Sequence, residues 1–231
     1  LFTIRTTRST LIAKSVLGSF GKRSNLDLKW KRPFVLRRND RFSNYVGIKY
    51  HIRLEADPEM IALHNFSDGY CGVSRIENDD WCLCYLTRAI NLQKTKNDIH
   101  AMEREILSKN PWLRNIFEHA EFVWKEPLTI AQVSFAPKGQ VEDHILMAGD
   151  SAGLIAPLCG NGMSMALHAS KIATELIGDF LRGQLSRSEM EELYEKRWKK
   201  AFGRRVWIGR CIQAFFGKAW ITNLFVGVLK P

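Results

Sequence analysis

The sequence predicts a mixed fold of the α/β (α+β) class, and three patterns along its 231 residues support this class. A short apolar run, Ile145 to Ala148, ends in Gly149-Asp150 and leads through a glycine-rich turn into a long helical pattern. That helical pattern begins after Gly162. The segment from Tyr45 to Leu54 alternates apolar and polar residues, which is typical of a half-buried antiparallel strand. The chain therefore combines a strand-to-helix unit with an antiparallel sheet.

The remaining elements follow from local signals. Two strand patterns, Leu1 to Thr6 and Leu11 to Leu17, flank a turn at Arg8-Ser9. A basic linker is expected after about residue 27, through Pro33 and Arg41. These strands argue against reading the Arg- and Ser-rich start as a transit peptide. Ser186-x-x-Glu189 is a capping box that opens a helix. Further strands and short helices are expected at residues 60–66, 69–76, 81–87, 97–109, 111–119, 122–124 and 130–135.

The composition of the chain favours some classes of protein and argues against others. The chain carries 34 basic and 24 acidic residues, a net charge of +10, and its hydrophobic content of 45% is enough for a full core. The positive charge suits an anionic cofactor or membrane surface, while the lack of an aromatic-basic repeat argues against nucleic acid. The five cysteines, Cys82-x-Cys84 included, show no metal-ligand spacing, and no long apolar run predicts a spanning helix. We expect reduced thiols, no metal site and a cytoplasmic location.

The segment from Gly149 to Met163 contains most of the candidate ligand-binding residues. Asp150 follows four apolar residues, at a position where a carboxylate has no packing role. Pro157 and the turn Gly160-Asn161-Gly162 precede a helix whose unpaired N–H groups and positive end suit an anionic or electron-rich ligand. The alternative is a simple strand–turn–helix connection in which Asp150 caps the loop.

This order of strand, Gly-Asp, Pro, Gly-x-Gly and helix resembles the second flavin-contacting motif of the FAD-dependent monooxygenase and geranylgeranyl reductase superfamily. The resemblance implies that Asp150 hydrogen-bonds the ribityl chain of FAD. It also implies that the loop and helix start from Pro157 to Met163 face the pyrimidine edge of the isoalloxazine ring, and that Gly149 belongs to the cofactor-binding residues. The flavin would then carry the redox chemistry, with NAD(P)H as electron donor. No catalytic side chain can be assigned from spacing.

A second match lies near the N-terminus. A strand pattern there ends in Gly18-x-x-Gly21, which is similar to the family's segment beside the FAD diphosphate, although Phe20 stands where many members have Asp. The Gly-x-Gly-x-x-Gly segment that seats the pyrophosphate does not occur in the chain. We therefore expect a C-terminal portion of a longer protein, which by itself holds FAD weakly or not at all.

Three domains are expected from the patterns and the resemblance. Residues 1–27 and 140–183 form part of a Rossmann-like FAD-binding domain, residues 28–139 an inserted antiparallel-sheet substrate domain, and residues 184–231 a C-terminal helical cap. Apolar side chains from Ala201 onward either pack on the sheet domain or lie on a membrane. We expect burial, with peripheral membrane contact as a second role, for Trp207, Ile208, Ile212, Phe215 and Phe216.

The leading functional hypothesis is an FAD-dependent oxidoreductase, of the monooxygenase or alkene reductase type, acting on a hydrophobic small molecule or lipid. The segment Asp68 to Val73 resembles the reductase branch more than the aromatic hydroxylases. Two alternatives from other classes stay open: a non-catalytic truncated fragment, and a membrane-peripheral binding protein. The reading frame upstream of Leu1 would discriminate the first alternative from an enzyme.

Overall fold

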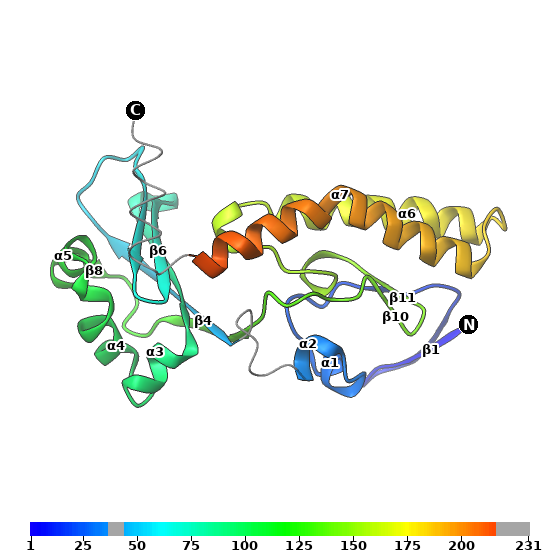
Figure 1. Ribbon diagram of the computed structural model, residues 1–231, viewed down its shortest axis with the longest axis horizontal. Coiled ribbons are helices and arrows are strands. Elements are labelled where there is room, and N and C mark those ends of the chain that lie inside the picture. The colour runs from blue at the N-terminus through cyan, green and yellow to red at the C-terminus, as the bar shows by residue number, and fades with distance from the viewer. Residues whose placement is uncertain (37–43, 216–231) are drawn as a thin grey trace. The chain divides into compact units, whose positions relative to one another are not determined.

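The computed structural model describes residues 1–36 and 44–215, with side chains through residue 213. The chain forms two compact units. The described part of unit 1 is residues 1–36 and 134–213, and that of unit 2 is residues 44–133 together with the helix end 214–215. The sheet unit is thus inserted into the chain of the other, and each is considered separately below (Figure 1). This mixed architecture confirms the predicted fold class.

Unit 1 is built around a small sheet. Strand β3 (Leu17–Gly18) runs parallel to β11 (Ile145–Met147), which pairs in the antiparallel sense with β10 (Val141–Glu142). The hairpin predicted at the N-terminus is confirmed as β1 (Phe2–Arg5) and β2 (Thr10–Ala13). Two residues separated by more than a hundred positions in the chain, Gly18 and Met147, therefore lie opposite each other.

The helices of unit 1 fall into two groups. Two short helices follow β3, and two long helices follow β11 by way of 3₁₀ turns. Their bounds are α1 (Asn25–Lys29), α2 (Pro33–Leu36), the turns η3 (Gly149–Ser151) and η4 (Pro157–Cys159), α6 (Gly162–Leu181) and α7 (Arg187–Phe215).

A basic linker was expected after residue 27, and this expectation is wrong for Pro33–Leu36, which form α2. Helix α1 was not predicted, although Ser24 and Asp27 form a complete capping box at its start. The Ser24 N–H donates to the Asp27 carboxylate at 2.7 Å, and the Ser24 hydroxyl accepts from the Leu26 N–H at 3.2 Å. The linker residues 37–43, including Arg37-Arg38 and Arg41, lie outside the described residues.

Helices α6 and α7 lie side by side and form the core of unit 1 with β11 (Figure 1). The capping box predicted for α7 is confirmed, since the Ser186 N–H donates to Glu189 and the Glu189 N–H donates to Ser186. One face of each helix is apolar and buried. These core residues are Met165, Ala169, Ile172, Ala173 and Leu176 from α6, and Met190, Tyr194, Trp198, Phe202 and Val206 from α7.

Helix α7 was expected to belong to a C-terminal helical cap from residue 184, and its apolar face packs in the core of unit 1. The burial expected for its apolar residues is wrong at two positions. Trp207 is 63% exposed and Ile208 is 39% exposed, because the buried face of the helix passes instead through Phe202, Val206 and Gly209. Ile212 is half-buried, while the Phe215 side chain and Phe216 lie outside the described residues.

Unit 2 is an antiparallel sheet with helices inserted between its strands. The strand order is β5-β6-β7-β4-β8, and β9 also pairs with β4. The strands are β4 (Tyr45–Arg53), β5 (Ile61–Phe66), β6 (Gly69–Arg75), β7 (Trp81–Arg88), β8 (Glu121–Phe122) and β9 (Leu128–Val133). The helical elements are η1 (Glu77–Asp79), α3 (Ala89–Lys94), α4 (Ile99–Glu105), η2 (Leu107–Lys109) and α5 (Pro111–His119).

The alternation predicted in this sheet is confirmed. Val46, Ile48, Tyr50 and Ile52 of β4 are buried in one core with residues of α4 and α5. The opposite face of β4 carries Lys49 and His51, whose cross-strand partners on β7 are Cys84 and Cys82. Helix α3 was not predicted, because the chain passes directly from β7 into it without a capping side chain.

Gly69 provides a sharp test of packing in this sheet. A Cβ atom at Gly69 would lie 2.6 Å from the Leu86 carbonyl oxygen and 2.5 Å from the Phe66 ring, whereas one at Gly72 would meet its nearest neighbour at 3.9 Å. Gly69→Ala should therefore lower the free energy of unfolding by about 1–3 kcal/mol. Gly72→Ala, its matched control, should leave it equal or higher. Urea denaturation of both variants measures this, and equal effects would contradict the packing described.

Candidate functional site

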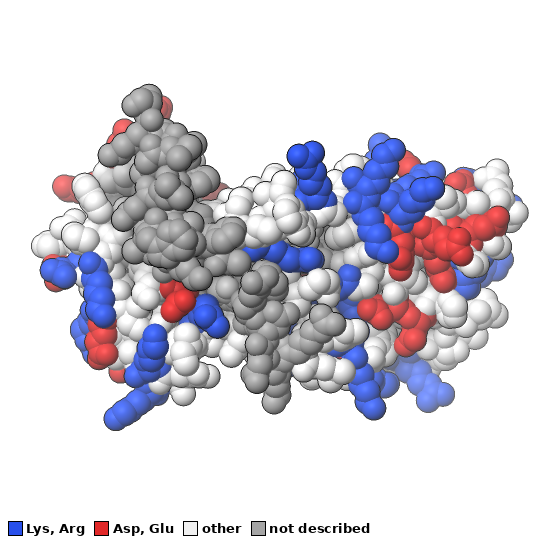
Figure 2. All heavy atoms as spheres, viewed as in Figure 1, with Lys and Arg blue, Asp and Glu red and all other residues white. Residues whose placement is uncertain are grey.

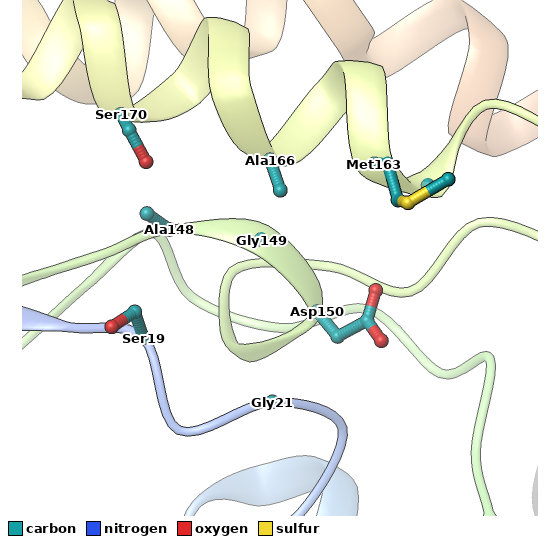
Figure 3. A pocket seen from close by; sticks show the side chains of 9 residues that line it. Ser19, Gly21, Ala148, Gly149, Asp150, Met163, Ala166 and Ser170 are labelled. Atoms are coloured by element: carbon teal, nitrogen blue, oxygen red, sulfur yellow. The ribbon is translucent and has the colours of Figure 1, made fainter.

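Unit 1 contains a cavity of about 380 Å³ where three segments meet (Figure 3). The strands β3 and β11 are parallel, so their carboxyl ends reach the same edge of the sheet. Loops at that edge are the usual ligand-binding position in open α/β sheets. The wall consists of Ser19 and Gly21 after β3, Ala148, Gly149 and Asp150 after β11, and Gly162, Met163, Ala166 and Ser170 of α6.

The structure brings five of the nine predicted site residues into this wall: Gly21, Gly149, Asp150, Gly162 and Met163. Gly18 lies at the end of β3, paired with Met147. The other three, Pro157, Gly160 and Asn161, form the turn that leads into α6 and do not line the cavity.

Four residues of the wall were not predicted from the sequence: Ser19, Ala148, Ala166 and Ser170. The spacing of Ala166 and Ser170 along α6 could have indicated these two. Gly162, Ala166 and Ser170 follow one another at intervals of four along α6, so they lie on one face of the helix. This row of small side chains leaves the cavity open along the first turns of α6. Ser19 and Ala148 adjoin predicted positions and carried no signal of their own.

Glycines leave part of the wall without side chains. Gly21 has φ of +81°, a left-handed conformation that favours glycine, and a Cβ placed there would meet nothing within 4 Å. A Cβ at Gly162 would also project into open space. A ligand can therefore approach the backbone directly at both positions.

The start of α6 offers unpaired donors. Its N-cap residue Asn161 makes no side-chain capping bond, and the first turn contains no acidic residue. Among the described residues, no acceptor is recorded for the N–H groups of Gly162, Met163 and Ser164. A helix of 20 residues with an uncapped start presents these donors and the positive end of its dipole to an electron-rich group.

Asp150 is the acidic residue of the wall. Its side chain projects from η3, as Figure 3 shows, and is half-buried. Burial raises the pKa of its carboxyl group, while the charge of Lys138 acts in the opposite direction. Within the described residues no donor is recorded for this carboxylate, so its acceptor capacity remains available to a ligand.

The backbone of the Gly-Asp loop is held by a fully buried arginine that the sequence analysis did not identify. The Arg32 guanidinium donates to the Ser151 carbonyl at 3.0 Å, to the Gly139 carbonyl at 2.9 Å and to Asp27 at 2.9 Å. Its Nε donates to Glu142 at 3.0 Å. Two carboxylates therefore compensate one buried cation, and its other donors fix the loop.

A buried lysine holds the same loop from beside Arg32. The Lys138 ammonium donates to the Asp150 carbonyl at 2.7 Å and to the Lys22 carbonyl at 2.6 Å, and it lies 4.4 Å from the centre of the Phe34 ring. Its pKa is lowered to about 8, chiefly by burial. Lys138 thus joins the loop after β3 to the loop after β11 and contributes positive charge close to Asp150.

Three further side chains complete the support. The Ser151 hydroxyl lies 2.6 Å from the carbonyl oxygens of both Gly18 and Ala148. The Gln140 amide donates to the Ala152 carbonyl at 3.1 Å, and the Tyr194 hydroxyl donates to the Met147 carbonyl. The backbone around Asp150 is therefore fixed from its buried side, while its carboxylate faces the cavity.

Two negative findings concern the described residues alone. They contain no group of three or more His, Cys, Asp or Glu side chains that could hold a metal ion. No helix within 1–36 and 44–215 combines the length and apolar character that crossing a membrane requires.

No protein-family model matches the chain. Among curated proteins, an uncharacterized protein of Methanocaldococcus jannaschii is 36% identical over 77 residues, which are 33% of this chain and 19% of that protein. Conditioned medium factor receptor 1 of Dictyostelium discoideum is 29% identical over 58% of this chain and 26% of its own length. Digeranylgeranylglycerophospholipid reductase 2 of Methanothermobacter thermautotrophicus is 33% identical over 28% of this chain and 17% of its own length.

Solved structures match over most of the chain. A geranylgeranyl bacteriochlorophyll reductase-like protein of Thermoplasma acidophilum superimposes with a TM-score of 0.71 and 18% identity, over 93% of this chain and 54% of the other. The flavin-dependent halogenase CmlS gives 0.68 and 17%, over 88% and 38%. PqsL of Pseudomonas aeruginosa, a probable FAD-dependent monooxygenase, gives 0.66 and 14%, over 98% and 62%.

The chain therefore shares its fold with flavin-dependent and FAD-dependent proteins, among them a halogenase, a geranylgeranyl reductase-like protein and a probable monooxygenase. The resemblance inferred from the sequence is thereby confirmed. The named relatives with this fold are flavin-dependent oxidoreductases. The chain spans less than two thirds of the length of each of these relatives and solved structures.

The lowered pKa of Lys138 has a consequence for stability. Between pH 8 and the ordinary lysine value of 10.5, the unfolded chain keeps a proton that the folded chain has released, so this residue's contribution to stability rises with pH. The Lys138→Met variant has no ionisable group at this position, so its stability lacks this contribution. The difference in free energy of unfolding, wild type minus variant, should therefore increase across the window, by up to about 1.4 kcal/mol per pH unit.

Urea denaturation at several pH values between about 7 and 10 measures this difference. Lys200→Met changes an exposed lysine of α7 and serves as the control, with an expected difference that stays flat. A flat difference for Lys138→Met as well would contradict the buried, pKa-shifted lysine.

Proposed function

We propose that the cavity of unit 1 binds the flavin of an FAD-dependent oxidoreductase. The observation that carries this proposal is the meeting of three features in one wall: an acidic side chain without a recorded partner, side-chain-free glycines and an uncapped helix start. A flavin has a ribityl chain with hydroxyl donors and a ring that becomes electron-rich when it is reduced. The wall offers an acceptor for the first and N–H donors for the second.

Specific residues would hold each part of FAD. The Asp150 carboxylate would accept hydrogen bonds from the ribityl hydroxyls, with the Lys138 network keeping its backbone in place. The N–H groups at the start of α6 would stabilise negative charge on the ring. Gly18, Gly21 and the adjoining basic residues would lie beside the diphosphate. When bound, the flavin would supply the redox chemistry, and this chain would supply binding, orientation and electrostatic bias.

The proposed reaction is that of a monooxygenase or an alkene reductase, on a hydrophobic small molecule or lipid, with NAD(P)H as electron donor. The open face of the sheet in unit 2 supports an apolar substrate. Leu63 of β5 and Leu128 and Ile130 of β9 are 46%, 56% and 44% exposed. Leu63 and Leu128 end a cross-strand row that passes through Gly72, Cys84 and Lys49, on the face opposite the core. Ile130 pairs with Gly47, two residues before Lys49 on β4.

A variant of Asp150 tests the flavin proposal. Asp150→Ala should weaken FAD binding about tenfold to a hundredfold, because a charge-assisted hydrogen bond contributes roughly 1.5–3 kcal/mol. Asp143→Ala removes an exposed carboxylate of the same unit and should leave the affinity unchanged. Equilibrium titration with FAD, followed by flavin absorbance, resolves weak as well as tight binding. Equal affinity of wild type and Asp150→Ala would rule out the assignment.

Peripheral membrane contact is a second candidate property, favoured by the exposure of Trp207. This side chain lies on α7 one turn after the exposed Arg204, so the two share one face of the helix. Figure 2 shows basic side chains over the region of α7, with acidic ones next to them along part of the helix. An exposed aromatic ring on the same helix face as an arginine is suited to an anionic lipid surface.

Vesicle co-sedimentation tests this property. Binding to anionic vesicles should be measurable at low salt and weaken at high salt, since each basic residue near the surface contributes about 1 kcal/mol. Trp207→Ala should reduce the bound fraction. Trp112→Ala, which removes a tryptophan of similar exposure from α5, should not. Absence of binding at low salt would exclude a membrane role for this part of α7.

A further inference from the structure

Unit 2 contains a cavity of its own, which shares no residue with the flavin cavity proposed above. It has a volume of about 400 Å³ and lies where α4 and α5 pack against β4 and β8. A volume of this size is within the range of cavities that bind small molecules. Its wall combines one buried carboxylate, two cations and three aromatic rings, together with His100.

The carboxylate at its base is Glu103, which is buried on α4. One of its oxygens, Oε1, accepts from the Tyr50 hydroxyl at 2.8 Å and from the Tyr85 hydroxyl at 2.6 Å. The other, Oε2, lies 3.1 Å from Nδ1 of His100. Two hydroxyl donors therefore occupy both lone pairs of Oε1, while Oε2 retains room for one more donor.

Two cations stand in the same wall. Arg104 follows Glu103 on α4, and His100 lies one turn earlier, so α4 presents all three side chains on neighbouring positions of one face. Lys125 reaches the cavity from the segment after β8. Within the described residues, no hydrogen bond or ion pair is recorded for Arg104 or Lys125. The cavity therefore has positive charge available to an anionic group.

The remaining wall is aromatic. The rings of Phe117 and Phe122 are nearly parallel, at 11° and 6.3 Å between their centres. Tyr50 meets Phe122 edge-on at 4.9 Å. Flat apolar groups pack well against such rings, since offset-stacked and edge-to-face contacts are the favoured arrangements.

We propose that this cavity binds a small aromatic carboxylate. Arg104 and Lys125 take the carboxylate group of the ligand, and the rings of Phe117 and Phe122 take its aromatic body. Oε2 of Glu103 accepts from a hydroxyl or amine on the ring where one is present. This site is additional to the flavin cavity and does not depend on the function proposed for it.

A purely structural role for Glu103 explains less of the wall. Two tyrosine hydroxyls that need acceptors inside the core account for a carboxylate between β4, β7 and α4. They do not account for an open volume beside it, nor for two cations that line this volume without a recorded partner. A ligand that carries both an anionic group and a ring explains the three features together.

Calorimetric titration of the whole chain with three probes tests the proposal: phenylacetate, acetate and benzyl alcohol. Phenylacetate combines ring and anion and should bind, while acetate and benzyl alcohol each lack one part and should bind at least about tenfold more weakly. Arg104→Gln and Lys125→Gln should each weaken phenylacetate binding about tenfold, as expected for loss of a charge-assisted contact. Phe117→Leu keeps an apolar side chain but removes the ring, and should weaken binding several-fold.

The control variant is Lys109→Gln, which removes an exposed positive charge just after α4 that does not line the cavity. It should bind phenylacetate as the wild type does. Thermal unfolding of each variant confirms that it is folded before titration. Absence of phenylacetate binding at millimolar concentration would overturn the proposal. So would binding that Arg104→Gln and Lys125→Gln leave unchanged, or equal affinity for benzyl alcohol.

Discussion

The buried guanidinium of Arg32 is the interaction on which the rest of unit 1 depends. A cation removed from water is stable only when charges and acceptors surround it, and here Asp27, Glu142 and two backbone carbonyls do so. The partners come from segments 107 to 119 residues away as well as from the adjoining helix α1. One side chain therefore joins the chain before the inserted sheet to the chain after it.

This arrangement explains how a loop can be rigid and still present a reactive side chain. The carbonyls of Gly139, Asp150, Ser151 and Ala152 all accept from buried side chains, so the peptide units around Asp150 have little freedom. The Asp150 carboxylate takes no part in this network. Small residues on α6 face it across the cavity and leave the intervening space open. A preorganised acceptor beside an uncapped helix start is the physical basis of the proposed flavin site.

The sequence predicted much of this fold from local rules. Alternation located the strands of unit 2, and the pair Ser186 and Glu189 located the start of α7, because such signals depend on near neighbours alone. The sequence also identified Asp150 and Gly162, both of which line the cavity of unit 1. The roles of Arg32 and Lys138 could not be predicted, because a basic residue in a turn is usually solvated and only distant partners make its burial favourable. The exposure of Trp207 was missed for a similar reason, since the rotation of α7 is set by its packing against α6.

Amide hydrogen exchange in the Arg32→Lys variant tests the central claim most directly. Lysine keeps the positive charge but lacks the planar guanidinium group, whose fixed N–H donors bind several acceptors at once. The N–H groups of Ala152 and Gly153, which donate to the Gly149 carbonyl, report on the loop itself. We expect faster exchange at residues 148–153 and in α1, with exchange in the middle of α6 unchanged. Unchanged exchange at residues 148–153, or a uniform acceleration throughout unit 1, would contradict a guanidinium network that specifically holds the Gly-Asp loop.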